Sequence, residues 1–209
     1  MIAFVLMVLA SRPATAQAMD ARPLSAGAIV ESVVCDSDSS QSYALYLPSS
    51  YSSIRRWPII YFFDPGGRGA RPVQLYRETA EKYGFVIAGS NNSQNFSTDD
   101  LSKTLNAIWQ DTHRRLMLDE RRIYTSGFSG GARVAGAMAL GCGPCHVAGV
   151  IVHGAGYPSG ERSAARDRMD YFLAVGDLDF NWREVIGIRR EREALGQPYR
   201  EEKFSDPHQ

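Results

Sequence analysis

The sequence is poor in cysteine and carries no net charge. Its 209 residues include three cysteines, Cys35, Cys142 and Cys145, which allows one disulfide and leaves the bonded pair open. Lys and Arg together number 23, as do Asp and Glu, so the formal net charge is zero. This balance gives no electrostatic reason to expect nucleic acid or an anionic membrane as a partner, and we expect neither.

The sequence also offers no apolar run at its start that is long enough to span a membrane. The run MIAFVLMVLA occupies residues 1–10, whereas a spanning helix needs about 20 apolar residues. Ala14-Thr15-Ala16 fits the cleavage pattern of a secretory signal, although no Lys or Arg precedes the apolar run. We expect a signal peptide over residues 1–16, one domain over 17–209 and a secreted or periplasmic protein. A buried N-terminal helix is the alternative.

Internal repeats and low-complexity linkers are absent from the sequence, and strand-like runs alternate with helix-like runs. Strands are expected at 28–35, 42–48, 57–63, 85–90, 122–128, 147–156, 171–175 and 199–204, and helices at 73–84, 97–118, 131–141 and 183–196. The first two strands are close enough to form an antiparallel pair. The alternation predicts an α/β fold with a mostly parallel sheet and helices on both faces, and with ligands at the carboxyl ends of the strands.

The motif GFSGG, residues 127–131, lies between a predicted strand and a predicted helix. It matches G-x-S-x-G, in which a sharp turn projects the serine above the sheet at a helix N-terminus. Glycines are needed because a side chain beside such a turn would meet the neighbouring elements. We therefore predict that Ser129 is a nucleophile. The alternative is a glycine-rich turn in which the serine only caps a helix.

A serine hydroxyl needs a base and an orienting acid, which in this arrangement follow it in the order acid, then histidine. Of the four histidines, His113, His146 and His153 precede every late acid in the chain. Only His208 has the right order, and we predict it as the base. The acid is expected in the loop after 171–175, where Asp179 is favoured and Asp177 remains the alternative.

An oxyanion hole needs two donors, usually main-chain N–H groups. One is expected at Gly130, directly after the nucleophile. The other is expected in the loop DPGGRG after the third strand, where Pro65 has no N–H, so Gly66 or Gly67 must donate, and Gly66 is the donor that we predict. An ordinary Pro-Gly-Gly turn is the alternative interpretation of this loop.

These motifs resemble those of the α/β-hydrolase superfamily. GFSGGAR resembles the nucleophile turn, GDLDFN looks like the acid loop with Asp179 at the matching position, and HQ resembles the start of the histidine segment. The chain looks most like secreted esterases similar to polyhydroxybutyrate depolymerases and feruloyl esterases, with prolyl-oligopeptidase-like peptidases more distant. FFDPGGRG departs from the usual His-Gly signature and leaves the second oxyanion donor open. Because one residue follows His208, the sequence predicts truncation at the C-terminus.

A second motif points to different chemistry. CGPCH, residues 142–146, matches the attachment signature of c-type haem and also resembles a redox-active cysteine pair. It follows a predicted helix and precedes a predicted central strand, which leaves no pocket for haem. We interpret it as a structural loop.

Together these features predict a secreted serine hydrolase that cleaves a small-molecule or polymer ester through an acyl-enzyme, with no cofactor and no metal. Two alternatives remain, a serine peptidase of the prolyl-oligopeptidase-like type and a catalytically inactive hydrolase-fold binding module.

Overall fold

Eight strands form one sheet in the computed structural model, which describes residues 24–96, 100–141, 146–156, 169–205 and 207–208. The predicted signal peptide, Cys142 and Cys145 lie outside the described residues. The strands are β1 (Ile29–Cys35), β2 (Asp38–Tyr46), β3 (Trp57–Phe63), β4 (Val86–Ser90), β5 (Leu118–Phe128), β6 (Gly149–His153), β7 (Asp170–Gly176) and β8 (Arg200–Phe204).

The sheet is mostly parallel, as the alternation of strands and helices predicts. Its strand order is β1-β2-β4-β3-β5-β6-β7-β8. The β1–β2 and β2–β4 pairs are antiparallel, whereas the pairs from β4 through β8 are parallel. Strands β3, β5, β6 and β7 therefore end at the same edge, which is where the predicted site residues of the chain follow them.

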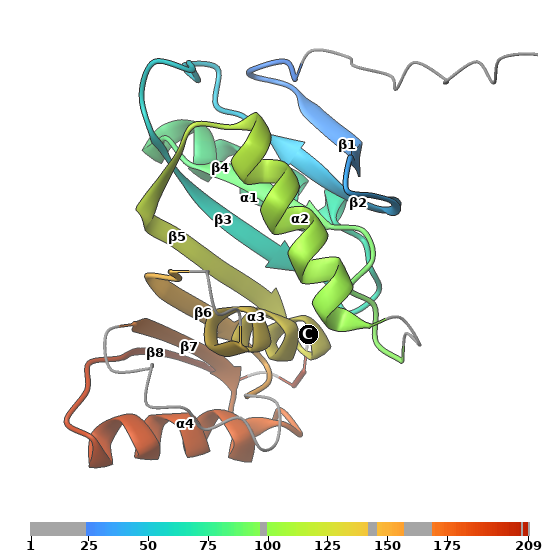
Figure 1. Cartoon of the computed structure of the whole chain (residues 1–209). Coiled ribbons are helices and arrows are strands. Elements are labelled where there is room, and N and C mark those ends of the chain that lie inside the picture. The colour runs from blue at the N-terminus through green and yellow to red at the C-terminus, as the bar shows by residue number, and fades with distance from the viewer. Residues whose placement is uncertain (1–23, 97–99, 142–145, 157–168, 206, 209) are drawn as a thin grey trace, which may run out of the picture.

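Helices cover both faces of this sheet (Figure 1). They are α1 (Ala70–Tyr83), α2 (Leu101–Arg115), α3 (Gly130–Gly141) and α4 (Trp182–Ala194). Helix α1 packs on one face, where Val73 and Ala80 join a small cluster with Phe62 and Ile87. Helices α2, α3 and α4 contribute to a larger cluster on the other face. None of the helices described is long and apolar enough to cross a membrane.

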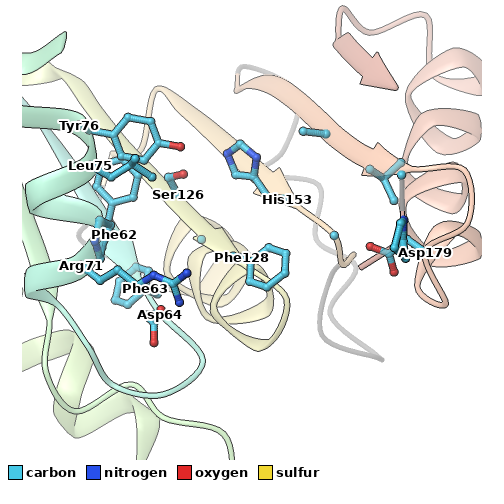
Figure 2. A pocket seen from close by; sticks show the side chains of 17 residues that line it. Phe62, Phe63, Asp64, Arg71, Leu75, Tyr76, Ser126, Phe128, His153 and Asp179 are labelled. Carbon is cyan, nitrogen blue, oxygen red and sulfur yellow. The ribbon is translucent and has the colours of Figure 1, made fainter. Parts of the chain in front are cut away.

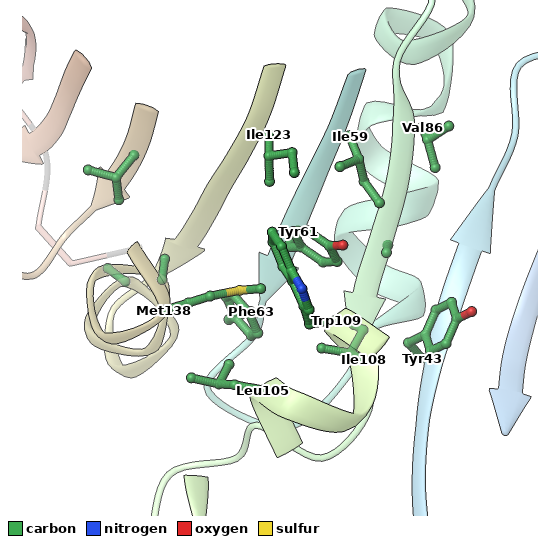
Figure 3. Close-up of a cluster of buried hydrophobic side chains, with 14 of the residues drawn as sticks. Tyr43, Ile59, Tyr61, Phe63, Val86, Leu105, Ile108, Trp109, Ile123 and Met138 are labelled. Carbon is green, nitrogen blue, oxygen red and sulfur yellow. The ribbon is translucent and has the colours of Figure 1, made fainter. Parts of the chain in front are cut away.

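The larger cluster is built from strand residues that face α2 and α3 (Figure 3). Ile59, Tyr61 and Phe63 alternate along β3 and are almost fully buried. They meet side chains of α2 such as Trp109, whose ring centroid lies 6.0 Å from that of Tyr61. This apolar contact, together with burial on the α1 side, explains why β3 reads as a continuous apolar run.

Buried Asp111 ties α2 to the first hairpin. Its carboxylate accepts hydrogen bonds from the Tyr43 hydroxyl (2.8 Å) and the main-chain N–H of Asp36 (3.0 Å). It also pairs with Arg114 (3.0 Å) and Arg115 (2.7 Å). The charge is thus compensated inside the fold, which is the condition under which a buried carboxylate is tolerated.

Most element boundaries differ from the sequence prediction by one to four residues, among them the start of β2 at Asp38 and the bounds of α2, and three of the differences have a clear physical reason. Helix α1 begins at Ala70 and not at residue 73, because Pro72 fits the first helical turn, where no N–H is needed. Strand β5 begins at Leu118 and not at 122, because Leu118 pairs with Trp57 of β3, and the charged residues 119–122 form an irregularity before the pairing resumes at Ile123. Strand β6 ends at His153, since Gly154 takes a left-handed φ of 61°.

Candidate active site

Ser129 lies on a tight turn between β5 and α3. Its φ is 53°, a left-handed conformation that residues other than glycine rarely adopt. Its main-chain N–H donates to the carbonyl of His153 at the end of β6, at 2.8 Å. The strained turn is thus held from the neighbouring strand, and Ser129 sits at the carboxyl edge of the sheet with its side chain partly exposed.

The flanking glycines are required by close backbone contacts. A Cβ atom on Gly127 would overlap the carbonyl oxygen of Gly131, and a Cβ atom on Gly131 would overlap the carbonyl oxygen of Phe63. The first contact closes the turn on itself and the second presses it against the end of β3. The spacing of the motif therefore follows from the packing of this turn in the structure.

Helix α3 starts at Gly130, directly after the serine. The first N–H groups of a helix have no acceptor within it, and the helix dipole places partial positive charge there. A negative charge that forms beside Ser129 would meet this helix N-terminus. The Gly130 N–H is the first of these groups.

Asp179 and His208 meet beside this turn, although 29 positions separate them in sequence. His208 Nδ1 lies 2.7 Å from Asp179 Oδ2. The Asp179 side chain is almost fully buried, whereas Asp177, the alternative acid, is exposed. A Cβ atom on Gly154 would lie 3.0 Å from Asp179 Oδ2 and 3.1 Å from His208 Nδ1, so both side chains pack over this glycine.

The Asp179 carboxylate is fixed by its own loop. Its other oxygen, Oδ1, accepts from the main-chain N–H of Asn181 at 2.7 Å. The Asn181 side chain donates to the carbonyl of Gly154 (2.8 Å) and accepts from Arg133 (3.2 Å). Arg133 also pairs with Glu184 at 2.7 Å. These contacts link the acid loop to α3 and to the end of β6, and they orient the carboxylate toward His208.

The His208 ring contacts two phenylalanines. Phe128, the residue before Ser129, stacks on it with centroids 4.7 Å apart and an interplanar angle of 28°. Phe180, from the acid loop, lies 4.4 Å away on a tilted ring, and its side chain is 77% exposed. The imidazole is therefore held next to the serine turn by a residue of the turn itself.

The N–H groups of the loop after β3 donate hydrogen bonds to acceptors in the same loop. The Gly66 N–H donates to Asp64 Oδ1 at 2.8 Å, and the Gly67 N–H donates to the Asp64 carbonyl at 3.0 Å. Asp64 also pairs with Arg68, at 2.8 Å. The Gly66 N–H, expected from the sequence to bind the oxyanion, is thus hydrogen-bonded within the loop.

A pocket of about 300 Å³ runs along the carboxyl edge from α1 to the acid loop. Figure 2 shows Arg71, Phe63 and Asp64 at one end, Phe128 and His153 in the middle, and Asp179 at the other end. Burial lowers the pKa of His153, so this imidazole is neutral at physiological pH. Within the described part of the chain, no group of His, Cys, Asp and Glu side chains is arranged to hold a metal ion.

The sequence prediction assigns no specific role to two residues at this site, although the polar loop that contains Asn95 was expected to be able to line it. Asn95 lies against Gly130, and Phe180 covers His208. Both stand in loops that follow parallel strands, so their position at the carboxyl edge was a usable signal. Their contacts with the turn and the imidazole depend on how those loops fold back, which the sequence pattern does not encode.

Comparisons with known proteins agree on the architecture. No family model matches this chain, and no curated protein matches its sequence. Among solved structures, FphF, a fluorophosphonate-binding serine hydrolase of Staphylococcus aureus, aligns over 88% of this chain and 92% of its own, with 13% identity and a TM-score of 0.67.

Two further structures have related folds. A ferulic acid esterase aligns over 87% of this chain and 91% of its own, with 14% identity and a TM-score of 0.66. Dipeptidyl peptidase 4 of Porphyromonas gingivalis aligns over 87% of this chain but only 32% of its own, with 12% identity and a TM-score of 0.60. At such low identity a likeness establishes the fold and not the activity. The chain has the α/β-hydrolase fold, with one mostly parallel eight-stranded sheet and helices on both faces.

Proposed function

We propose that this protein is a serine hydrolase that cleaves carboxylic esters through an acyl-enzyme. The observation that carries the proposal is the contact of 2.7 Å between Asp179 Oδ2 and His208 Nδ1, made beside the strained turn of Ser129. A buried carboxylate, an imidazole and a serine on a strand-to-helix turn make up the set that nucleophilic acyl transfer requires.

The assignment of roles follows from which nitrogen of His208 contacts the acid. Because Nδ1–H donates to Asp179, Nε2 is the unprotonated nitrogen and can accept the proton of Ser129 Oγ. Ser129 Oγ then forms a bond to the ester carbonyl carbon, and the alcohol leaves with the proton returned by His208. Water, deprotonated by the same imidazole, breaks the acyl-enzyme and releases the carboxylic acid.

The oxyanion that forms in both steps needs donors beside Ser129. The Gly130 N–H at the start of α3 is the first donor that we propose. Gly66 was expected to supply the second, but its N–H donates to Asp64 Oδ1 in the structure. Gly66 can act only if it exchanges this carboxylate for the substrate oxygen.

The substrate class is part of the proposal and rests on likeness. An esterase and a fluorophosphonate-binding serine hydrolase share the fold over nearly their whole length. The resemblance of the motifs to those of polyhydroxybutyrate depolymerases and feruloyl esterases favours small or polymeric esters. A peptidase activity is the second candidate, since a dipeptidyl peptidase shares the fold over a third of its length.

The test is labelling by a fluorophosphonate probe combined with turnover of short nitrophenyl esters and matched anilides. We expect Ser129→Ala to abolish labelling and ester turnover, and the anilides to react at least tenfold more slowly than the esters. Ser40→Ala is the control, because Ser40 is an exposed serine on β2. Labelling of the Ser129→Ala protein at the rate of the Ser40→Ala protein contradicts the nucleophile, and faster anilide turnover favours the peptidase.

We also propose that the protein is exported and that residues 1–16 are removed. The support is the apolar run followed by Ala14-Thr15-Ala16. N-terminal sequencing of protein recovered from the periplasm or medium should begin at Gln17, and a start at Met1 contradicts export by a cleaved signal.

A further inference from the structure

The loop after β4 folds over the serine turn. The main-chain N–H of Asn95 donates to the carbonyl of Pro65 at 2.7 Å, and Gln94 forms an isolated antiparallel bridge with Gly66. Phe96, which follows Asn95, has a φ of 59° and a fully exposed side chain. Residues 91–96 are thus pinned to the loop after β3, and the turn at Phe96 is held in an uncommon conformation.

This arrangement places the Asn95 side chain against Gly130. A Cβ atom on Gly130 would overlap Asn95 Oδ1 and would lie 2.6 Å from Cγ and 2.8 Å from Nδ2. Only a glycine at position 130 leaves room for this amide. Among the described residues, the only hydrogen bond found for Asn95 is the one that its main-chain N–H donates to Pro65, and its side chain is exposed.

The competing donor, the Gly66 N–H, is held by a charged acceptor. Burial raises the pKa of Asp64, but hydrogen bonds from Arg68 and from the Gly66 N–H outweigh it and keep that pKa below its ordinary value. Asp64 is therefore ionised at neutral pH. A hydrogen bond to an ionised carboxylate is among the stronger ones, so an incoming ester carbonyl displaces it only at a cost.

We propose that the side-chain amide of Asn95 is the second oxyanion donor, acting with the Gly130 N–H. The inference rests on the proposed function, because it concerns the oxyanion formed when Ser129 attacks. Oδ1 is the amide atom nearest the Gly130 Cβ position, so the Asn95 amide turns about its Cβ–Cγ bond to bring Nδ2–H to the carbonyl oxygen as this gains negative charge. A neutral donor that turns toward the developing charge stabilises the transition state more than the bound ester.

The test compares Asn95→Ala with Gln94→Ala in the full chain. Gln94 is exposed, precedes Asn95 in the same loop and contributes its backbone to the bridge with Gly66. We expect Asn95→Ala to lower kcat for a nitrophenyl ester by about 10²- to 10³-fold with little change in KM, the loss known for one oxyanion donor. Gln94→Ala should stay within about threefold of the wild type in kcat.

A boronic acid inhibitor gives the second readout, because its tetrahedral adduct mimics the oxyanion. Its affinity should fall with kcat in Asn95→Ala and should be unchanged in Gln94→Ala. Asn95→Asp keeps the shape but places negative charge at the oxyanion, so its kcat should fall at least as far as that of Asn95→Ala. Asn95 variants that fold, as judged by circular dichroism, and keep kcat within threefold of the wild type overturn the proposal.

The two proposals fail in different ways. Full ester turnover by Ser129→Ala would refute the proposed hydrolase site itself. Loss of turnover in Ser129→Ala, combined with normal turnover in both Asn95 variants, would leave the hydrolase in place and refute only the role of Asn95.

Discussion

Replacing Asp179 by asparagine tests the proposed acid–base pair with the least change in shape. In the wild type, Asp179 accepts two hydrogen bonds at 2.7 Å, from His208 Nδ1 to Oδ2 and from the Asn181 N–H to Oδ1. An asparagine has one acceptor oxygen. The Asn181 main chain can only donate, so the oxygen of the new amide will face it and the NH₂ group will face His208.

This orientation forces His208 into the unproductive tautomer. Its Nδ1 must then accept from the amide, which moves the ring proton to Nε2, the nitrogen that should receive the proton of Ser129. Turning the amide around would set two donors against each other in a site where residue 179 is only 6% exposed. Such a buried unpaired donor costs about 1–3 kcal/mol. The orientation that allows the productive tautomer of His208 is therefore roughly 5- to 150-fold less populated than the other one.

The variant also lacks the negative charge that stabilises the imidazolium. With both effects, we expect kcat to fall about 10⁴-fold, equivalent to about 5.5 kcal/mol, as for other isosteric replacements of a triad acid. The assay is initial-rate turnover of a short nitrophenyl ester at pH 7, with enzyme concentration set by fluorophosphonate titration of the wild type. Asp177→Asn is the matched control, because Asp177 is exposed two residues earlier in the same loop.

We expect Asp177→Asn to retain kcat within about threefold of the wild type. If Asp179→Asn is well folded and retains more than a tenth of the wild-type kcat, the assignment of Asp179 as the orienting acid is wrong. Should Asp177→Asn lose activity instead, the acid is the other carboxylate of this loop.

Two further predictions concern stability and thiol chemistry. Asp111→Ala leaves the buried Tyr43 hydroxyl and the Asp36 N–H without their acceptor, whereas Arg114 and Arg115 keep Asp36 as a partner, and we expect a loss of about 1–3 kcal/mol in the free energy of unfolding. In thermal denaturation this is a decrease in Tm of roughly 2–12 °C, and an unchanged Tm contradicts the account. Cys35 is buried with a free thiol, and burial, the main cause, raises its pKa to about 12. Its neutral form supports the fold below the unfolded thiol pKa of about 8.5, and that support is lost as the pH rises toward 12. Native protein at pH 8 should therefore leave Cys35 unalkylated by iodoacetamide in peptide mapping, whereas urea-unfolded protein should be alkylated there; rapid native labelling would show that the site is open.

The secondary structure was largely predictable because its signals are local. The run at 57–63 is β3 to the residue, since an apolar stretch of that length buries on both faces only as a strand. Gly84 ends α1 with a left-handed φ of 72°, as expected for a C-terminal glycine. The boundary error at β5 arises where a tertiary contact overrules local preference, because Leu118 pairs with Trp57 of β3 ahead of the charged residues 119–122.

The serine turn was also predictable, since five consecutive residues carry it. The partners that we propose for Ser129 could be predicted only from their order along the chain. Asp179 and His208 were selected because they follow Ser129 in the expected sequence, and the structure brings them within 2.7 Å of each other. The expected second donor, Gly66, was chosen from its place in a glycine-rich loop. The sequence could not reveal that the carboxylate two residues before it would take its N–H.

The sequence by itself determined the positions of the turns, the buried strands and the place of Ser129 directly after β5. These features depend on neighbours that are only a few positions away in the chain. The tertiary structure alone decided that β4 inserts between β2 and β3, that Asn95 lies against Gly130 and that His208 contacts Phe128 and Phe180. These features join residues that are tens of positions apart, and their free energy comes from packing and hydrogen bonds that exist only once the sheet has formed.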